Sequence, residues 1–335
     1  MLRYVAAAVA VAAFALTAEA GRAAADLPAP LAQLHRDAGK LAARLQAPAA
    51  LEVFDLSTGY HTGLNASASM PAASTIKIPV MVEVFHQLET GRFDLQKRVV
   101  LRTSDKDWGS GDLCDAPAGT SYPVSELLEK MIDISDNTAT NMLIRLVGRH
   151  NINHSMTNLG LARTRLRDDI RTTGWSVRLE LRTSPSDLVR LLTLMAQRRL
   201  IDEWSSNEMI SILEQDQYNT LIPEPLPDDV PIAHKTGSFF DTLNDAGIVY
   251  TSDAPYVIAV MTTALPSQDR GRTFIHSISR LAYSDEVRLA RWRKASGLTF
   301  PAISGEPGTT SPDVRYWSSG NGPDESLVGG PGSIP

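Results

Sequence analysis

An apolar stretch at residues 73–85 places the strongest constraint on the fold of this chain. After a small-residue run the sequence reads Ile-Lys-Ile-Pro-Val-Met-Val-Glu-Val-Phe, with apolar residues at most positions and no glycine. The pattern predicts a buried helix that begins near Ala73. A helix without a broad polar face has to be enclosed by other elements, so much of the chain must pack around it.

Two polar residues, Ser74 and Lys77, lie on one face of this predicted helix, one turn apart. A serine hydroxyl is a poor nucleophile at neutral pH and needs a group that accepts its proton. A lysine surrounded by apolar residues is such a group, because burial disfavours its charged form. Taken alone, the pair is also compatible with a helix-start serine and a solvated lysine.

Two further motifs favour a catalytic interpretation. Ser135-Asp136-Asn137 precedes a helical pattern, and Lys235-Thr236-Gly237 lies on a predicted strand after His234. Each motif alone is explained by a helix cap or by an edge-strand lysine followed by a bulge or turn glycine. All three motifs, in this order and spacing, indicate an active site.

The three motifs together resemble the serine β-lactamase and penicillin-binding protein superfamily, in particular its class A-like branch. The resemblance covers residues from about 31 to about 296. It implies that Ser74 attacks a carbonyl, that Lys77 accepts its proton directly or through another group, and that Ser135 relays a proton to the leaving nitrogen. No metal or organic cofactor is implied.

The resemblance also implies a set of substrate-binding residues. Asn137 would bind the substrate's side-chain amide, and Lys235 and Thr236, followed by Gly237, would anchor its carboxylate. The backbone N–H groups of Ser74 and Ser238 would form the oxyanion hole. Trp108 stands near the position of an aromatic residue at the mouth of the groove, although a partly buried loop aromatic is an equal alternative.

One family motif is missing. Class A β-lactamases carry Glu-x-x-x-Asn between the second and third motifs, and residues 166–180 contain no such sequence. Counting from Gly160 puts Ile170 at the glutamate position, whereas counting back from Pro185 puts Asp168 there. Asp168 is therefore the leading candidate for the base that activates water, with Asp169 and Glu180 behind it. All three are also compatible with ordinary surface carboxylates.

Composition limits the possible classes of protein. The chain has 335 residues, of which 43% are hydrophobic, which allows one large domain or two closely packed halves. A net charge of −6 argues against a nucleic-acid partner. The resemblance implies a small β-lactam or a cell-wall peptide as substrate. Cys114 is the only cysteine, which excludes an intramolecular disulfide. We expect a monomer.

The order of the predicted elements indicates an α/β (α+β) fold. It consists of an antiparallel sheet whose strands come from both ends of the chain, flanked by helices, and a helical lobe inserted in mid-sequence. The resemblance implies the same architecture, with the active site in the groove between sheet and lobe. Helices are expected at residues 31–45, 124–134, 138–148, 185–198 and 270–296; strands at 50–56, 60–64, 232–239, 247–251 and 256–263.

Both ends of the chain differ from this body. Residues 1–25 combine Arg3, a short apolar run and small residues suited to signal peptidase, so they are predicted to be a signal peptide. The run is too short to span a bilayer, and a soluble periplasmic or secreted protein is expected. Residues 26–298 form the predicted hydrolase domain. Residues 299–335 are rich in Gly, Pro and Ser and are predicted to be a disordered tail.

Three hypotheses for function follow from the sequence. The first is an exported class A β-lactamase-like serine hydrolase that opens β-lactams through an acyl-serine, with slow deacylation as one possibility. The second is a D-Ala-D-Ala peptidase or slow penicillin-binding protein, which shares the motifs but lacks a dedicated deacylation base. The third is a non-catalytic binding module of the same fold, against which the intact Ser-x-x-Lys argues.

Overall fold

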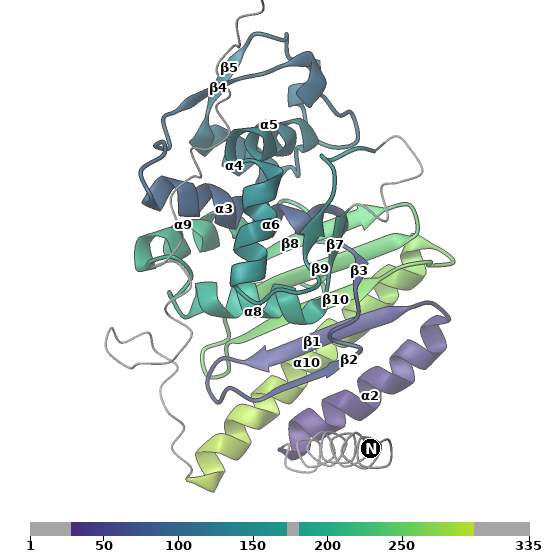
Figure 1. Cartoon of the computed structure of the whole chain (residues 1–335). Coiled ribbons are helices and arrows are strands. Elements are labelled where there is room, and N and C mark those ends of the chain that lie inside the picture. Colours follow the sequence, from purple (N-terminus) through teal and green to yellow (C-terminus); the bar gives the residue numbers. More distant parts are fainter. Residues whose placement is uncertain (1–27, 173–180, 298–335) are drawn as a thin grey trace, which may run out of the picture.

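A five-stranded antiparallel sheet forms the centre of the structure. The computed structural model describes residues 28–172 and 181–297. The strand order is β2-β1-β10-β9-β8, so strands from the two ends of the chain lie side by side (Figure 1). This arrangement confirms the expected fold class. The strands are β1 (Ala49–Asp55), β2 (His61–Leu64), β8 (Ile232–Phe239), β9 (Thr242–Val249) and β10 (Tyr256–Thr262).

Both faces of the sheet are covered. Every residue of β10 is buried, and its side chains alternate between two hydrophobic cores. Val257 and Met261 join the core shared with the helical lobe, whereas Ile258 and Val260 join the core on the opposite face. A strand buried on both sides reads as a continuous apolar run, as this one does.

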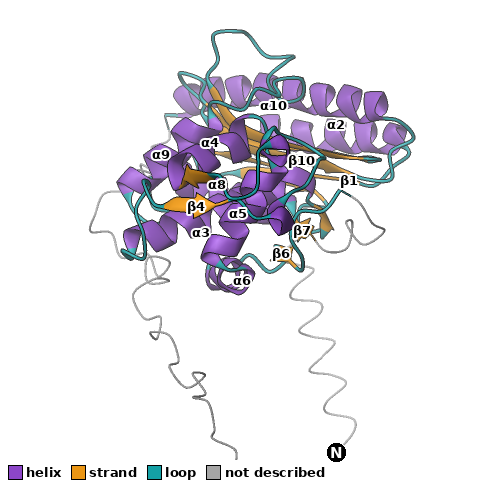
Figure 2. Ribbon diagram, turned by 90° about the horizontal axis from the view of Figure 1, so that it is seen from above, coloured by secondary structure: helices purple, strands orange, loops and turns teal. Residues whose placement is uncertain are grey.

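Helices α2 (Ala29–Leu45) and α10 (Gln268–Ser296) lie along one face of the sheet (Figure 2). The apolar stripe of α2 includes Leu31, Leu34 and Ala38, which are all buried in the core of this face. Ser267 caps the start of α10, because its side chain accepts a hydrogen bond from the Arg270 N–H.

The helical lobe lies against the other face (Figure 1). Helix α8 packs on β1, β9 and β10, and joins the lobe to the sheet. Its N-cap Ser184 and the following Pro185 fix its start, as the sequence indicates. The lobe helices are α3 (Lys77–Glu89), α4 (Val124–Asp133), α5 (Asn137–Val147), α6 (Arg149–Asn158), α8 (Pro185–Ala196) and α9 (Glu203–Leu213).

The predicted buried helix is present, but its first turn is tighter than expected. Ala73–Ile76 form a 3₁₀ helix, and the α-helix α3 begins at Lys77. Residues 77–85 are all buried, including both of their charged side chains, Lys77 and Glu83. Glu83 accepts hydrogen bonds from Gln87 and Ser155, which compensates for its removal from water.

The prediction for β9 is five residues too short at its start, because the strand begins at Thr242 rather than Gly247. The missed part contains Asn244 and Asp245, polar residues that are nonetheless fully buried. Asn244 donates to the carbonyls of Pro71 and Ala72, at 2.9 and 3.0 Å, and so ties β9 to the turn that carries Ser74. Because the polar side chain of Asn244 makes this long-range contact, the start of β9 lacks the apolar residues that would predict a buried strand.

Several short elements were not predicted, because no sequence pattern indicates them. Two- and three-residue strands form two small sheets, and helices α6 and α9 were also not predicted. The small-sheet strands are β3 (Met70–Pro71), β4 (Arg98–Val100), β5 (Ser121–Pro123), β6 (Arg165–Leu166) and β7 (Leu181–Thr183). Strands this short span too few residues to show a period.

The predicted signal peptide and the predicted C-terminal tail lie outside the described residues. Within residues 28–172 and 181–297, no helix combines the length and the apolar character needed to cross a membrane.

Candidate active site

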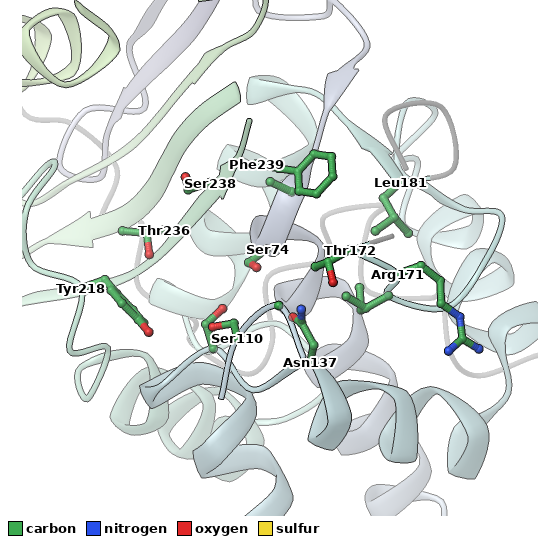
Figure 3. A pocket seen from close by; sticks show the side chains of 14 residues that line it. Ser74, Ser110, Asn137, Arg171, Thr172, Leu181, Tyr218, Thr236, Ser238 and Phe239 are labelled. Carbon is green, nitrogen blue, oxygen red and sulfur yellow. The ribbon is translucent and has the colours of Figure 1, made fainter. Parts of the chain in front are cut away.

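A cavity of about 340 Å³ lies between the edge strand β8 and the helical lobe. Ser74 lies near the middle of the view in Figure 3, with Thr236 and Tyr218 on one side and Thr172 on the other. All three sequence motifs contribute to its walls. The lining comes from Ala73 and Ser74; from Gly109, Ser110, Ser135 and Asn137; from Ile170, Arg171, Thr172 and Leu181; and from Tyr218, Thr236, Ser238 and Phe239.

Lys77 is completely buried and connects the first two motifs. Its Nζ lies 2.9 Å from Ser135 Oγ and 2.8 Å from Asn137 Oδ1, and also donates to the Ser135 carbonyl. Burial, and then the positive charge of Lys235, lower the pKa of Lys77 well below that of an exposed lysine. A neutral Lys77 amine has a lone pair with which it can accept a proton.

Ser135 has a left-handed backbone conformation, with φ of 56°. The turn is fixed by Asp136, a buried side chain that caps α5 through the Ala139 N–H and also accepts from the N–H groups of Asp112 and Leu113. A Cβ at Gly111 would lie 2.2 Å from an Asp136 oxygen, so only glycine fits there. The middle residue of the second motif therefore shapes the site without facing the cavity.

Asn137 has both ends of its amide engaged. Its Oδ1 accepts from Lys77, and its Nδ2 donates to Asp107 Oδ1 at 2.8 Å. The Asp107 carboxylate also accepts from the backbone N–H of Gly109 and from the backbone and hydroxyl of Thr172. Asp107 thus joins three walls of the cavity.

Asp107 was not predicted as a site residue, whereas its neighbour Trp108 was. A local signal does exist, because an aspartate two residues before a glycine is typical of a turn in which the side chain binds the backbone. Its contacts with Asn137 and Thr172, however, join segments far apart in the chain.

Lys235 forms a buried ion pair. Its Nζ lies 2.9 Å from Asp216 Oδ2, and both side chains are completely buried. The same Asp216 oxygen accepts from the Thr236 backbone N–H at 3.1 Å. The ring centre of Tyr218 lies 5.7 Å from Lys235 Nζ, a cation–π distance. Asp216 and Tyr218 lie in a loop that contains none of the three sequence motifs.

Gly237 allows β8 to approach the Ser74 turn. A Cβ at this position would lie 3.0 Å from the Ala72 carbonyl oxygen and 3.1 Å from the Ser74 backbone nitrogen. The third motif thus needs glycine for close backbone contact with the first. This contact also brings Ser238 to the rim of the cavity.

The structure does not bring Asp168 to the cavity. Asp168 is half exposed and lies 3.5 Å from Arg149, while Asp169 pairs with Arg171. Glu180 is outside the described residues. Ile170, only 6% exposed, lines the cavity instead.

The backbone explains this result. The Asn141 side chain accepts from the Ile170 N–H at 2.8 Å and donates to the Ile170 carbonyl at 3.1 Å. These two bonds fix Ile170 in place beside the cavity and leave the preceding Asp168 and Asp169 on the outside. The count from Gly160 thus selects a residue that lines the cavity, whereas the count from Pro185 selects one that does not.

Trp108 is 69% exposed, so it is not a partly buried loop aromatic. It is not among the residues that line the cavity, and its place at the mouth of the groove stays a prediction. The aromatic residues that do line it are Tyr218 and Phe239. Among the described residues, no group of three His, Cys, Asp or Glu side chains is arranged to hold a metal ion.

Comparison with known proteins agrees with this geometry. The model of the β-lactamase enzyme family matches residues 34–285. The extended-spectrum β-lactamase PER-1 of Pseudomonas aeruginosa is 24% identical over 67% of this chain and 78% of its own length. The solved structure of PBP-A is 31% identical, with a TM-score of 0.73 over 77% of this chain and 97% of that chain.

A variant of PBP-A has also been solved as an acyl-enzyme complex with penicillin G. It shares 31% identity with this chain, and its TM-score is 0.73 over 78% of this chain and all of that chain. The chain described here belongs to the β-lactamase enzyme family, and it is a serine hydrolase of the β-lactamase type.

The close approach at Gly237 generates a test of the site's construction. Gly237→Ala should lower the free energy of unfolding by about 1–3 kcal/mol, because the new methyl group meets backbone atoms that cannot turn aside. Gly39→Ala is a matched control in helix α2, where nothing lies within 4 Å of the added Cβ. The control should raise stability by about 0.5–1 kcal/mol. Denaturant unfolding measures both, and equal effects would contradict the proposed close contact.

Proposed function

We propose that this protein is an exported serine hydrolase on which β-lactams form an acyl-Ser74 intermediate that is hydrolysed slowly. One observation carries the proposal. Ser74 opens into a cavity together with Ser135 and Asn137, which bind the buried Lys77, yet none of the described residues that line this cavity is a carboxylic acid. The described part of the site is equipped for acylation and contains no carboxylic acid that could serve as the base for deacylation.

The acylation step uses the buried network. Ser74 Oγ attacks the lactam carbonyl carbon, and its proton passes to the neutral amine of Lys77. Ser135 Oγ, 2.9 Å from that amine, carries a proton to the lactam nitrogen as the C–N bond breaks. Lys77 suits this role because burial and Lys235 favour its neutral form by lowering its pKa.

Other residues of the site would bind the substrate. The backbone N–H groups of Ser74 and Ser238 would hold the developing oxyanion, and Asn137 would contact the amide of the substrate's side chain. Thr236 lines the cavity and offers its hydroxyl to the substrate. The similarity to PBP-A, whose variant has been solved with penicillin G attached, supports the assignment of β-lactams as acylating compounds.

A second candidate function is cleavage of cell-wall peptides by the same acyl-serine route. The apolar Ile170 beside the cavity favours this alternative, because an enzyme selected for rapid β-lactam hydrolysis needs a group that activates water. The two functions differ in the lifetime of the acyl-enzyme formed with a penicillin.

Export is part of the proposal and rests on the sequence of residues 1–25, with its basic, apolar and small-residue segments. The mature protein should then lack these residues. The intact mass of protein recovered from the periplasm or medium tests this, and retention of residues 1–25 would contradict it.

The central experiment is intact-protein mass spectrometry after addition of benzylpenicillin, followed over time. We expect an adduct of the mass of the whole penicillin that persists for many minutes, because no described carboxylic acid lines the cavity. Ser74→Ala should form no adduct. Ser277→Ala on α10, far from the cavity, should behave like the parent. An adduct on the Ser74→Ala protein would refute the assignment of the nucleophile.

The pH dependence of acylation tests the role of Lys77. Only the neutral amine accepts a proton, so the rate should fall as pH falls through the lowered pKa of Lys77. Lys235→Gln removes a positive charge that lowers this pKa, so the acidic limb of the profile should move to higher pH. The exposed Lys97→Gln is the control. An unmoved limb in Lys235→Gln would show that another group titrates.

The identity of residue 170 should control deacylation. Ile170→Glu places a carboxylate beside the cavity and should speed loss of the penicillin adduct by about 10²-fold or more, a typical contribution of a positioned base. Asp168→Asn should change neither acylation nor deacylation, because Asp168 points to Arg149. Glu180→Gln tests the remaining candidate carboxylate, which lies outside the described residues. Fast deacylation by the parent that disappears in Asp168→Asn would restore Asp168 as the base.

A further inference from the structure

The loop between α9 and β8 places a carboxylate on the donors that the family resemblance assigns to the substrate. Asp216 Oδ2 accepts from Lys235 Nζ at 2.9 Å and from the Thr236 N–H at 3.1 Å, and lies 3.4 Å from the Thr236 hydroxyl. Lys235 and Thr236 are the two residues expected to anchor a substrate carboxylate. In this chain the anion bound by these two residues is the carboxylate of the protein's own Asp216.

Asp216 is held firmly in this position. Its other oxygen, Oδ1, accepts from the Tyr218 N–H at 3.1 Å, and the neighbouring Gln217 N–H donates to the Asp133 carbonyl at 3.1 Å. The side chain is completely buried. Both carboxylate oxygens thus have partners, and the loop that carries them is attached to the end of α4.

Access to Lys235 is closed. The ammonium group has no exposed surface, with Asp216 at 2.9 Å on one side and the Tyr218 ring at 5.7 Å on another. A substrate carboxylate that approached Thr236 would also approach Asp216, and two carboxylates at one site repel each other. Removing Asp216 from Lys235 would break a buried ion pair, which is strongly unfavourable.

We propose that Asp216 is a specificity-determining residue that fills the anion subsite of this enzyme. The site then favours acyl donors with a neutral ester or amide at the place where a free carboxylate is otherwise bound. The carboxylate of an acyl donor that carries a free acid is bound only by hydroxyl groups such as those of Thr236 and Ser238, which line the cavity. This inference rests on the proposed acylation of Ser74.

The parent protein provides the first test, through its rates of acylation by benzylpenicillin and by the methyl ester of benzylpenicillin. The two compounds differ at one group only, which is a charged carboxylate in the first and a neutral methyl ester in the second. We expect the ester to acylate the protein at least as fast as the acid, because the filled subsite offers a free carboxylate no cation and Asp216 repels it. A preference for the acid of more than about thirtyfold would overturn the inference.

Asp216→Asn provides the second test. Asparagine keeps the shape and one acceptor oxygen but removes the charge, so Lys235 becomes available to an anion. The ratio of the acid rate to the ester rate should rise at least about tenfold, roughly the factor expected from one unscreened charge contact. Asp229→Asn, an exposed carboxylate in the loop before β8, should leave the ratio at the parent value.

The outcomes separate the possible explanations. If Asp216 only supports the fold, both rates fall together in Asp216→Asn and the ratio stays constant, which overturns the inference. If that variant does not fold, the parent's own ratio decides. Absence of any adduct with both compounds in the parent would refute the proposed function, and with it this inference. An adduct formed with a strong preference for the acid refutes the inference alone.

Discussion

The burial of Lys77 is the physical constraint on which the site depends. An ammonium group removed from water is costly unless its N–H groups find acceptors or its pKa falls, and both hold for Lys77. Acceptors from Ser135 and Asn137 surround its Nζ, and the nearby Lys235 favours the neutral form by lowering the pKa. The apolar residues of α3 make this environment, so the helix that organises the core also sets the chemistry.

Around this lysine, buried carboxylates hold the walls of the cavity in place. Asp136 fixes the turn of Ser135, Asp107 joins Asn137 to Thr172, and Asp216 binds the start of the third motif. Each is almost completely buried and accepts several hydrogen bonds, which is the condition under which a buried carboxylate is tolerated. The cavity therefore has a rigid polar frame, while the atoms proposed to react come from hydroxyl and amine groups.

Much of the fold could be predicted from the sequence, because its larger elements have clear periods and caps. Helices such as α2 and α8 and strands such as β8 and β10 begin and end within about two residues of their predicted bounds. The start of β9 was hidden because Asn244 and Asp245 are buried for long-range bonds rather than exposed. The sequence alone does not show whether a polar residue is buried for a long-range hydrogen bond or exposed to solvent.

For the site as well, residues in local sequence motifs could be predicted, whereas residues that act through long-range contacts could not. The structure brings Ser74, Ser135, Asn137 and Thr236 to one cavity, and these residues belong to contiguous motifs. Asp107, Asp216 and Tyr218 belong to no motif, since their importance lies in contacts across the fold. Asp168 was misplaced because residue counting ignores the bonds from Asn141, which decide that Ile170 lies beside the cavity.

The pairing of β1 with β10 has a consequence for how the protein is made. Leu51 lies opposite Val260, so the first long strand has no partner in the centre of the sheet until almost the whole domain has left the ribosome. Contacts this distant in the chain close slowly, because a long loop must be ordered before they form. The nascent N-terminal half thus cannot complete its sheet early. Such delayed folding suits the export proposed above, because a polypeptide that is still unfolded can be threaded across a membrane.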